Sequence, residues 1–277
     1  MKKYIVIAVL GSVFFSCSSS FKQISDSADP NGQSLKSFDV EPPSPLVATE
    51  GNYQTNPIDP SSVMMGYLIE GYKPTEDQFK KMTHVSISFL RAANSNGDIV
   101  MTNEWENIDD VITSAHSNNV KVLISFGGGE FKVTSELMGV KENRQNLIRN
   151  IIDFMIKHNL DGFDCDWEPS WINNKEEMEA INNAITNYYI VFIKEFREAL
   201  DIEFGKGNKL FTAAILNGNS IWYSDEKQIA HFPKNGWWNY LDWVSLMNYD
   251  NDIGNKHATF ESVFGVNGSV AYWTTFG

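Results

Sequence analysis

The pattern of apolar residues in the sequence predicts an α/β fold built on a parallel sheet or barrel. From Val63 onward, short apolar runs suited to buried strands alternate with longer runs whose apolar residues recur at helical spacing. This alternation is typical of strand–helix–strand units, in which a helix connects each parallel strand to the next. With 277 residues, of which 42% are hydrophobic, the chain is long and apolar enough to bury one sizeable core.

Six strands and five helical segments are expected in this part of the chain. Apolar runs predict strands at 64–69, 85–90, 120–126, 162–167, 210–216 and 243–247. Amphipathic runs between them predict helices at 75–82, 107–118, 143–158, 175–200 and 226–230. The first helix has a suitable start in Thr75, whose side chain can cap the free N–H groups of the first turn.

The N-terminus is typical of an export signal. Lys2 and Lys3 precede an apolar run at 4–15, which is shorter than the roughly 20 residues that a membrane-spanning helix needs. The run ends in Ser16-Cys17 and resembles a bacterial lipoprotein box, in which the Cys is acylated after cleavage. We expect residues 1–16 to be a signal peptide and Cys17 to be lipidated. The alternative is a conventional secreted protein in which this Cys is incidental.

Residues 17–62 are expected to form a flexible tether, because they are rich in Ser, Asp, Asn and Pro and lack a sustained apolar period. The predicted location is the bacterial cell envelope, lipid-anchored and either surface-exposed or periplasmic, with secretion as the alternative. With 22 basic and 35 acidic residues, the formal net charge is −13, which makes a nucleic-acid partner a poor fit.

The segment Asp161–Glu168 carries a row of acids. Side chains alternate between the two faces of a strand, so Asp164, Asp166 and Glu168 are expected on one face and apolar residues on the other. Successive acids would lie about 6.6 Å apart. Repulsion between like charges and loss of water should raise at least one of their pKa values, which provides a proton donor at neutral pH.

A calcium loop is the alternative interpretation, because such loops also contain alternating Asp residues. The sixth position of a calcium loop is Gly, whereas counting from Asp164 gives Pro169. The large apolar residues between the acids suit a buried strand better. The five His residues are scattered without the spacing of a metal site, so we predict no metal and no cofactor.

This segment resembles the motif Asp-Gly-x-Asp-x-Asp-x-Glu of family 18 glycoside hydrolases, the chitinase family, and matches every fixed position. Two further segments resemble family motifs in the expected order: Ser125-Phe126-Gly127-Gly128 and Met247-Asn248-Tyr249-Asp250. The resemblance implies a (β/α)8 barrel over residues 63–277 with its active site at the carboxyl ends of the strands. Only about six of the eight β/α units are present, so we expect the barrel domain to be incomplete at its C-terminus.

The resemblance also implies a mechanism and assigns roles. Glu168 would donate a proton to the leaving oxygen, while the substrate's own 2-acetamido oxygen attacks the anomeric carbon. Asp166 would orient and stabilise the acetamido group, and Asp164 would share a proton with Asp166 and tune its ionisation. Tyr249 would hydrogen-bond the acetamido carbonyl.

Further substrate-binding residues are expected at the ends of the strands. For the aromatic candidates, packing in the core is the alternative, and for the Gly pair a flexible turn is the alternative. These candidates are Tyr67, Phe89, Met247, Asp250, Gly127 and Gly128.

The Trp residues fall into two groups. Trp167 and Trp243 lie inside strands and are expected to pack, whereas the Trp residues after the fourth and fifth strands are candidates for stacking on sugars. These are Trp171, Trp222, Trp237 and Trp238.

The predicted function is hydrolysis of β-1,4 links in N-acetylglucosamine polymers with retention of configuration. One alternative is an endo-β-N-acetylglucosaminidase that acts on N-glycan cores with the same chemistry. Another is a non-catalytic glycan-binding surface protein, against which the presence of Glu168 argues.

Overall fold

The computed structural model describes residues 5–7, 63–69, 71–102, 105, 107–128, 135–167, 183, 185–216 and 236–247. All of them belong to one compact unit, formed by Met1–Leu10 and Ala48–Gly277. The predicted tether with Cys17, the helix expected at 226–230, and most of the predicted signal peptide lie outside the described residues. None of the helices within the described ranges combines the length and apolar character that crossing a bilayer requires.

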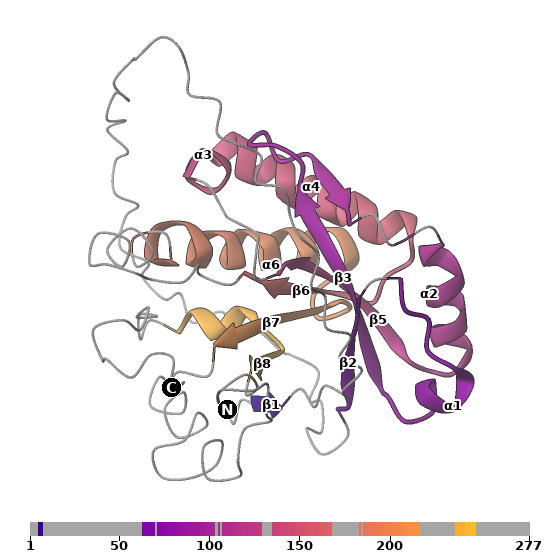
Figure 1. Cartoon of the computed structure of the whole chain (residues 1–277). Helices are drawn as coiled ribbons and strands as arrows, with labels where there is room; N and C mark the ends of the chain where they lie inside the picture. Colours follow the sequence, from indigo (N-terminus) through magenta and orange to yellow (C-terminus); the bar gives the residue numbers. More distant parts are fainter. Residues whose placement is uncertain are drawn as a thin grey trace, which may run out of the picture. The chain divides into compact units, whose positions relative to one another are not determined.

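The described part of the chain is a partial (β/α) barrel, as predicted (Figure 1). Its parallel strands follow the order β1-β8-β7-β6-β5-β3-β2, and the short β4 pairs antiparallel with β3. Their bounds are β1 Ile5–Ile7, β2 Met65–Leu68, β3 His84–Ala92, β4 Ile99–Met101, β5 Lys121–Gly127, β6 Gly162–Asp166, β7 Leu210–Leu216 and β8 Trp243–Met247. β1 pairs with β8 at the end of the sheet opposite β2.

Helices cover the outer face of the sheet, with α4 and α6 side by side (Figure 1). A partly buried ion pair joins these two helices, because Arg144 on α4 lies 2.9 Å from Glu195 on α6. Thr75 caps α1 in a complete capping box with Gln78, as expected. The bounds are α1 Glu76–Phe79, α2 Ile108–Ser117, α3 Ser135–Gly139, α4 Lys141–Lys157, η2 Ile185–Tyr189, α6 Ile190–Phe204 and η5 Trp237–Tyr240.

Two layers of side chains pack on opposite faces of the sheet. On the helix side, alternate strand residues such as Val122, Ile124, Phe163 and Phe211 join one large apolar core with the helices. On the inner side, a small apolar cluster gives way to buried polar residues toward the carboxyl ends of the strands. The small cluster contains Met65, Leu123, Leu210 and Trp243, and the polar residues include Ser86, Ser125, Asp164, Thr212 and Ser245.

The starts of three strands are fixed by the same contact. Thr83, Asp161 and Asp242 each directly precede a strand, and each side chain accepts a backbone N–H from the start of the neighbouring strand or from the residue just before it. The donors are Met64 at 2.8 Å, Val122 at 2.8 Å and Phe211 at 2.7 Å, respectively. These contacts fix neighbouring strands relative to each other at the end opposite the predicted site, and hence set the register.

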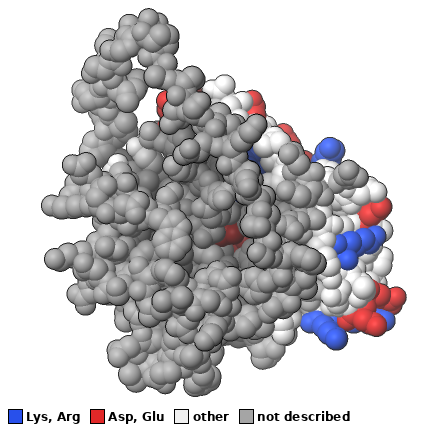
Figure 2. Space-filling model, in the orientation of Figure 1, with Lys and Arg blue, Asp and Glu red and all other residues white. Residues whose placement is uncertain are grey.

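The surface over α1 and α2 carries acidic and basic side chains intermixed (Figure 2). Lys80 on α1 illustrates this, since it forms ion pairs with Glu76 at 2.8 Å and Asp77 at 3.7 Å. Such exposed pairs contribute little to stability. This part of the molecule is an ordinary solvated surface.

Candidate active site

The acidic and apolar residues of β6 lie on opposite faces of the sheet, as predicted. Phe163 and Cys165 lie in the core on the helix side, whereas Asp164 hydrogen-bonds with residues of the inner side. Asp164 is completely buried, and Asp166, one layer nearer the carboxyl end, is 5% exposed. Glu168, the predicted proton donor, lies outside the described residues.

Asp164 accepts hydrogen bonds from three hydroxyl groups, each on a different strand. Its Oδ2 accepts from Tyr67 on β2 at 3.0 Å and from Ser125 on β5 at 2.9 Å. Its Oδ1 accepts from Thr212 on β7 at 2.5 Å. Ser125, Asp164 and Thr212 are direct partners across neighbouring strands, so the register of the sheet creates this arrangement.

Two opposing effects act on the charge of Asp164. Burial raises the pKa of its carboxyl above the ordinary range, and the hydrogen bonds from Thr212, Ser125 and Tyr67 offset part of this increase. Burial, followed by the charges of Asp164 and Asp166, also raises the pKa of Tyr67 well above its ordinary value. Tyr67 therefore remains a protonated hydrogen-bond donor at every physiological pH.

Gly127 and Gly128 bring the end of β5 against Asp166. The Gly128 N–H donates to the Asp166 carbonyl oxygen at 2.9 Å. A Cβ atom on Gly127 would lie 2.2 Å from that same oxygen, and one on Gly128 would lie 3.2 Å from the Phe89 ring. Both residues also have positive φ, of 122° and 90°, which Gly adopts without a steric penalty. Only Gly fits here, so the interpretation as a mere flexible turn is set aside.

The other predicted site residues lie in three kinds of place. Tyr67 contacts the acid row directly, which decides between the two roles that its sequence position left open. Phe89 is half-buried against Gly128, and Met247 is 9% exposed at the end of β8. Tyr249 and Asp250 lie outside the described residues.

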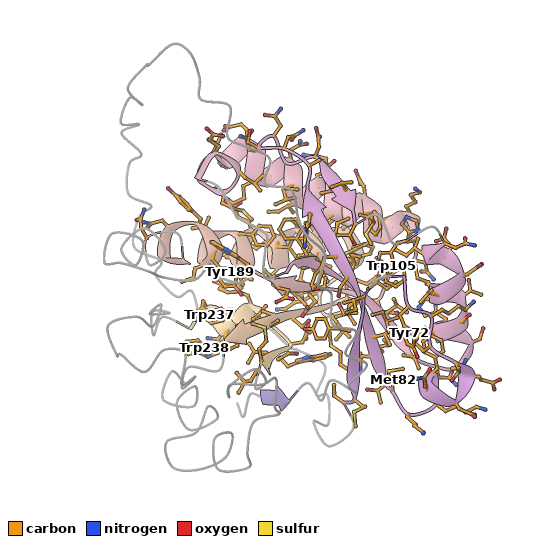
Figure 3. All side chains as sticks on the ribbon, viewed as in Figure 1. Tyr72, Met82, Trp105, Tyr189, Trp237 and Trp238 are labelled. Carbon is orange, nitrogen blue, oxygen red and sulfur yellow. The ribbon has the colours of Figure 1, made fainter. Side chains whose placement is uncertain are left out.

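Buried aromatic residues support the helix side of β6. The centre of the Tyr189 ring lies 4.9 Å from that of Trp167. It lies 5.7 Å from the centre of the Trp237 ring, and Figure 3 shows these two side chains as neighbours. Trp237 is only 2% exposed, so its proposed role as a sugar-stacking residue is wrong. Trp167 and Trp243 are buried as expected, Trp238 is half-buried, and Trp171 and Trp222 lie outside the described residues.

Two residues of the site were not recognised as hydrogen-bond donors in the sequence. In the sequence, Ser125 stands out only as part of a motif, and Thr212 only as one residue of a predicted strand. Thr212 has a signal in retrospect, because it is the only hydroxyl-bearing residue in the apolar run Leu210–Leu216. A lone hydroxyl in a buried strand requires a hydrogen-bond partner.

The donors around Asp164 are those of a hydrogen-bonded carboxylate. Three hydroxyl groups occupy the positions around its oxygens, which favours the strand interpretation over the calcium loop. Within the described ranges, no group of three or more His, Cys, Asp or Glu side chains is arranged to hold a metal ion. Cys165, which stands between Asp164 and Asp166 in the sequence, is buried in the core. Burial raises the pKa of its thiol, so Cys165 is a packing residue.

Comparison of the sequence with known proteins finds similarity to family 18 glycosyl hydrolases, in agreement with the three motifs. The model of glycosyl hydrolases family 18 matches residues 63–277. The chain is 28% identical over 191 residues to a chitinase-like effector of Moniliophthora perniciosa, which covers 67% of this chain and 41% of that protein. It is 27% identical over 175 residues to a class V chitinase of Lotus japonicus, which covers 61% of this chain and 41% of that protein. The chain thus spans about two fifths of the length of these curated relatives.

Solved structures share the fold. A chitinase from Bacteroides thetaiotaomicron superposes with a TM-score of 0.55 at 26% identity, covering 77% of this chain and 62% of that one. A class V chitinase from Nicotiana tobaccum gives a TM-score of 0.61 at 20% identity, covering 78% of this chain and 63% of that one. The family model covers all the parallel strands from β2 to β8. The chain therefore belongs to glycosyl hydrolase family 18.

Proposed function

We propose that the protein hydrolyses β-1,4 links between N-acetylglucosamine units of chitin or chitooligosaccharides. The observation that carries this proposal is the buried Asp164, which is held by three hydroxyl groups directly behind Asp166. A carboxyl group fixed in this way cannot relax toward solvent, and such preorganisation behind Asp166 is what stabilisation of a developing positive charge requires. Membership of family 18 and the likeness to chitinases support the choice of substrate.

The proposed reaction has two steps. In the first, the acetamido oxygen of the substrate bonds to the anomeric carbon, the glycosidic bond breaks, and Glu168 protonates the departing oxygen. In the second, water attacks the anomeric carbon, opens the cyclic intermediate, and returns a proton to Glu168. Two displacements at one carbon retain its configuration.

Asp166 has the position for assisting this reaction. Its strand face is shared with Asp164, and the Gly127–Gly128 backbone packs against its carbonyl oxygen. Its carboxylate would orient the acetamido N–H and stabilise the positive charge that develops on the nitrogen. Asp164 and Tyr67 would control when Asp166 is ionised, and Tyr249 would hold the acetamido oxygen in line.

The test is hydrolysis of chitotetraose by the full chain and its Glu168→Gln variant. We expect turnover by the wild type and a loss of at least about a hundredfold in kcat in the variant, with binding of the tetramer retained, because general acid catalysis contributes factors of this size. Near-normal turnover by Glu168→Gln would refute the assignment. Release of N-glycans from a glycoprotein, without cleavage of the tetramer, would instead assign the endo-β-N-acetylglucosaminidase activity.

We also propose that Cys17 anchors the protein to a bacterial membrane through a lipid. The support is the apolar run at 4–15 after Lys2 and Lys3, which ends next to a small residue and a Cys. The test is partition of the full-length protein and its Cys17→Ser variant between membrane and soluble fractions. Membrane association that the variant loses is expected, and equal partition of both proteins would contradict the anchor.

A further inference from the structure

The β3–β4 hairpin lies beside the candidate site and is held in place by contacts with α4. β3 is longer than its neighbours, and its last partner on β5 is Phe126, which pairs with Leu90. Beyond that point β3 pairs with β4, and the hairpin lies along α4 (Figure 1). The Asn146 and Asn150 side chains of α4 donate to the carbonyl oxygens of Asn96 and Gly97, at 2.7 and 2.9 Å.

The turn of this hairpin fits closely onto α4. A Cβ atom on Gly97 would lie 2.5 Å from the Asn143 carbonyl oxygen, so only Gly allows this approach. Asn94 closes the turn by accepting the Asn96 N–H at 3.0 Å and donating to Asp98 at 2.8 Å. The hairpin is therefore held at its tip and at its base. A side chain at its base has a defined position relative to the acid row.

Arg91 is that side chain. Leu90 and Ala92 pack into the core on the helix side, so the alternation of the strand directs Arg91 to the opposite, inner side. Its Nε donates to the Gly127 carbonyl oxygen at 3.3 Å. Gly127 is the direct register partner of Asp166. The guanidinium group thus lies one strand away from the predicted catalytic acids.

Arg91 has no acidic partner in the part of the chain that the structure describes. Its side chain is half-buried, and among the described residues no carboxylate lies within ion-pair distance of it. A guanidinium group has five N–H donors, has no acceptor, and keeps its charge at every relevant pH. It therefore favours sugar oxygens, including an acetamido carbonyl. It disfavours an ammonium group, which is also positively charged and also only a donor.

We propose that Arg91 is a specificity-determining residue that selects an N-acetylated sugar and rejects glucosamine at the position beside the end of β3. This inference rests on the proposed function. The sugar whose link is cleaved must carry an acetamido group in any case, because its oxygen performs the attack. Arg91 would require an acetamido group on a neighbouring sugar as well, where the attack on the anomeric carbon does not need one.

The experiment compares the wild type with Arg91→Gln, which removes the charge, and Arg91→Lys, which keeps it. Arg149→Gln is the matched control, because Arg149 is exposed on α4. The substrates are fully acetylated chitotetraose and a partially de-N-acetylated chitosan, and the chitosan products are sequenced for the positions of glucosamine. Thermal melting verifies that each variant is folded.

For Arg91→Gln we expect kcat/KM on chitotetraose to fall about tenfold to a hundredfold, mainly through KM, the range for losing a hydrogen bond from a charged donor. We also expect glucosamine to appear at the neighbouring position in the chitosan products, whereas Arg91→Lys and Arg149→Gln keep the wild-type pattern. An unchanged glucosamine pattern in Arg91→Gln overturns the inference while leaving the proposed function intact. A wild type that cleaves neither substrate overturns the proposed function, and the inference with it.

Discussion

Replacing Thr212 by Val removes one of the three hydroxyl donors to Asp164 while nearly preserving side-chain shape. The lost hydrogen bond measures 2.5 Å and is completely buried. Hydrogen bonds to charged groups contribute about 1.5–3 kcal/mol, and an unsatisfied buried oxygen finds no water to replace the donor. We therefore expect Thr212→Val to lower the free energy of unfolding by about 1.5–3 kcal/mol at neutral pH, and to raise the pKa of Asp164 further, because a hydrogen bond that favours its charged form is lost.

The sign of the pH dependence follows from the raised pKa of Asp164. The folded state binds this proton more tightly than the unfolded state, so stability falls as the pH rises from the ordinary pKa through the folded one, and then levels off. Thr212→Val extends this decrease to higher pH. The penalty is largest where the carboxylate is ionised, and it shrinks at mildly acidic pH.

The assay is urea unfolding of wild type and variant at neutral and at mildly acidic pH. Thr113→Val is the control, because Thr113 is exposed on α2 and its substitution should change stability by less than about 0.5 kcal/mol. A Thr212→Val penalty that is the same at both pH values would refute the reasoning, since it would show that the hydroxyl does not act through the charge of Asp164.

Two further substitutions test the architecture around the site. Asp242→Ala removes the acceptor of the Phe211 N–H and the buried ion-pair partner of Arg197, 3.5 Å away, and we expect it to lower the free energy of unfolding by about 2–4 kcal/mol in urea titrations. Gly127→Ala places a Cβ atom 2.2 Å from the Asp166 carbonyl oxygen, so we expect a loss of at least about 2 kcal/mol in stability, together with loss of chitotetraose hydrolysis.

Each of these substitutions has a control in the same chain. Asp242→Asn keeps an oxygen acceptor for the Phe211 N–H but loses the charge that pairs with Arg197, so it should lose less stability than Asp242→Ala; equal losses would show that the ion pair, and not the strand-start contact, accounts for the effect. Gly66→Ala places a Cβ atom 3.0 Å from the flexible end of Met82 and should be tolerated better than Gly127→Ala. A fully active Gly127→Ala protein would show that the close approach of β5 to Asp166 is not required.

The strands could be predicted from the sequence because their signals are local. Apolar runs and β-branched residues located the strands from β2 to β8, apart from β4, to within two residues at each end, including β7 and β8 without error. β4 was missed because its three residues pair with β3 only through the hairpin, and a run this short has no periodicity of its own. The separation of the acids of β6 from its apolar residues, on opposite faces of the sheet, also follows from local alternation.

The contacts of Asp164 could not be predicted in the same way. Its donors lie 97, 39 and 48 residues away in the chain, at Tyr67, Ser125 and Thr212. They meet only because the sheet register places Ser125 and Thr212 on either side of Asp164. Register depends on the long-range contacts that fix the strand starts, such as those of Asp161 and Asp242. For the same reason, the sequence could not decide whether Tyr67 belonged to the core or to the site.

For Trp237, the sequence argument was wrong, because a local signal suggested an exposed side chain that the structure buries. It follows a strand in sequence, where sugar-binding residues are common, but its ring packs against Tyr189 at 5.7 Å. Burial of this kind is decided by elements distant in the chain, here η5 and the end of η2.

The anomeric configuration of the first product tests the account most directly. Chitotetraose hydrolysis by the full chain would be followed by proton NMR before the sugar anomers equilibrate. A mechanism in which the acetamido group attacks and Asp166 assists predicts that the β-anomer appears first, and that Asp166→Asn slows its formation. First appearance of the α-anomer, or wild-type turnover in Asp166→Asn, would contradict it.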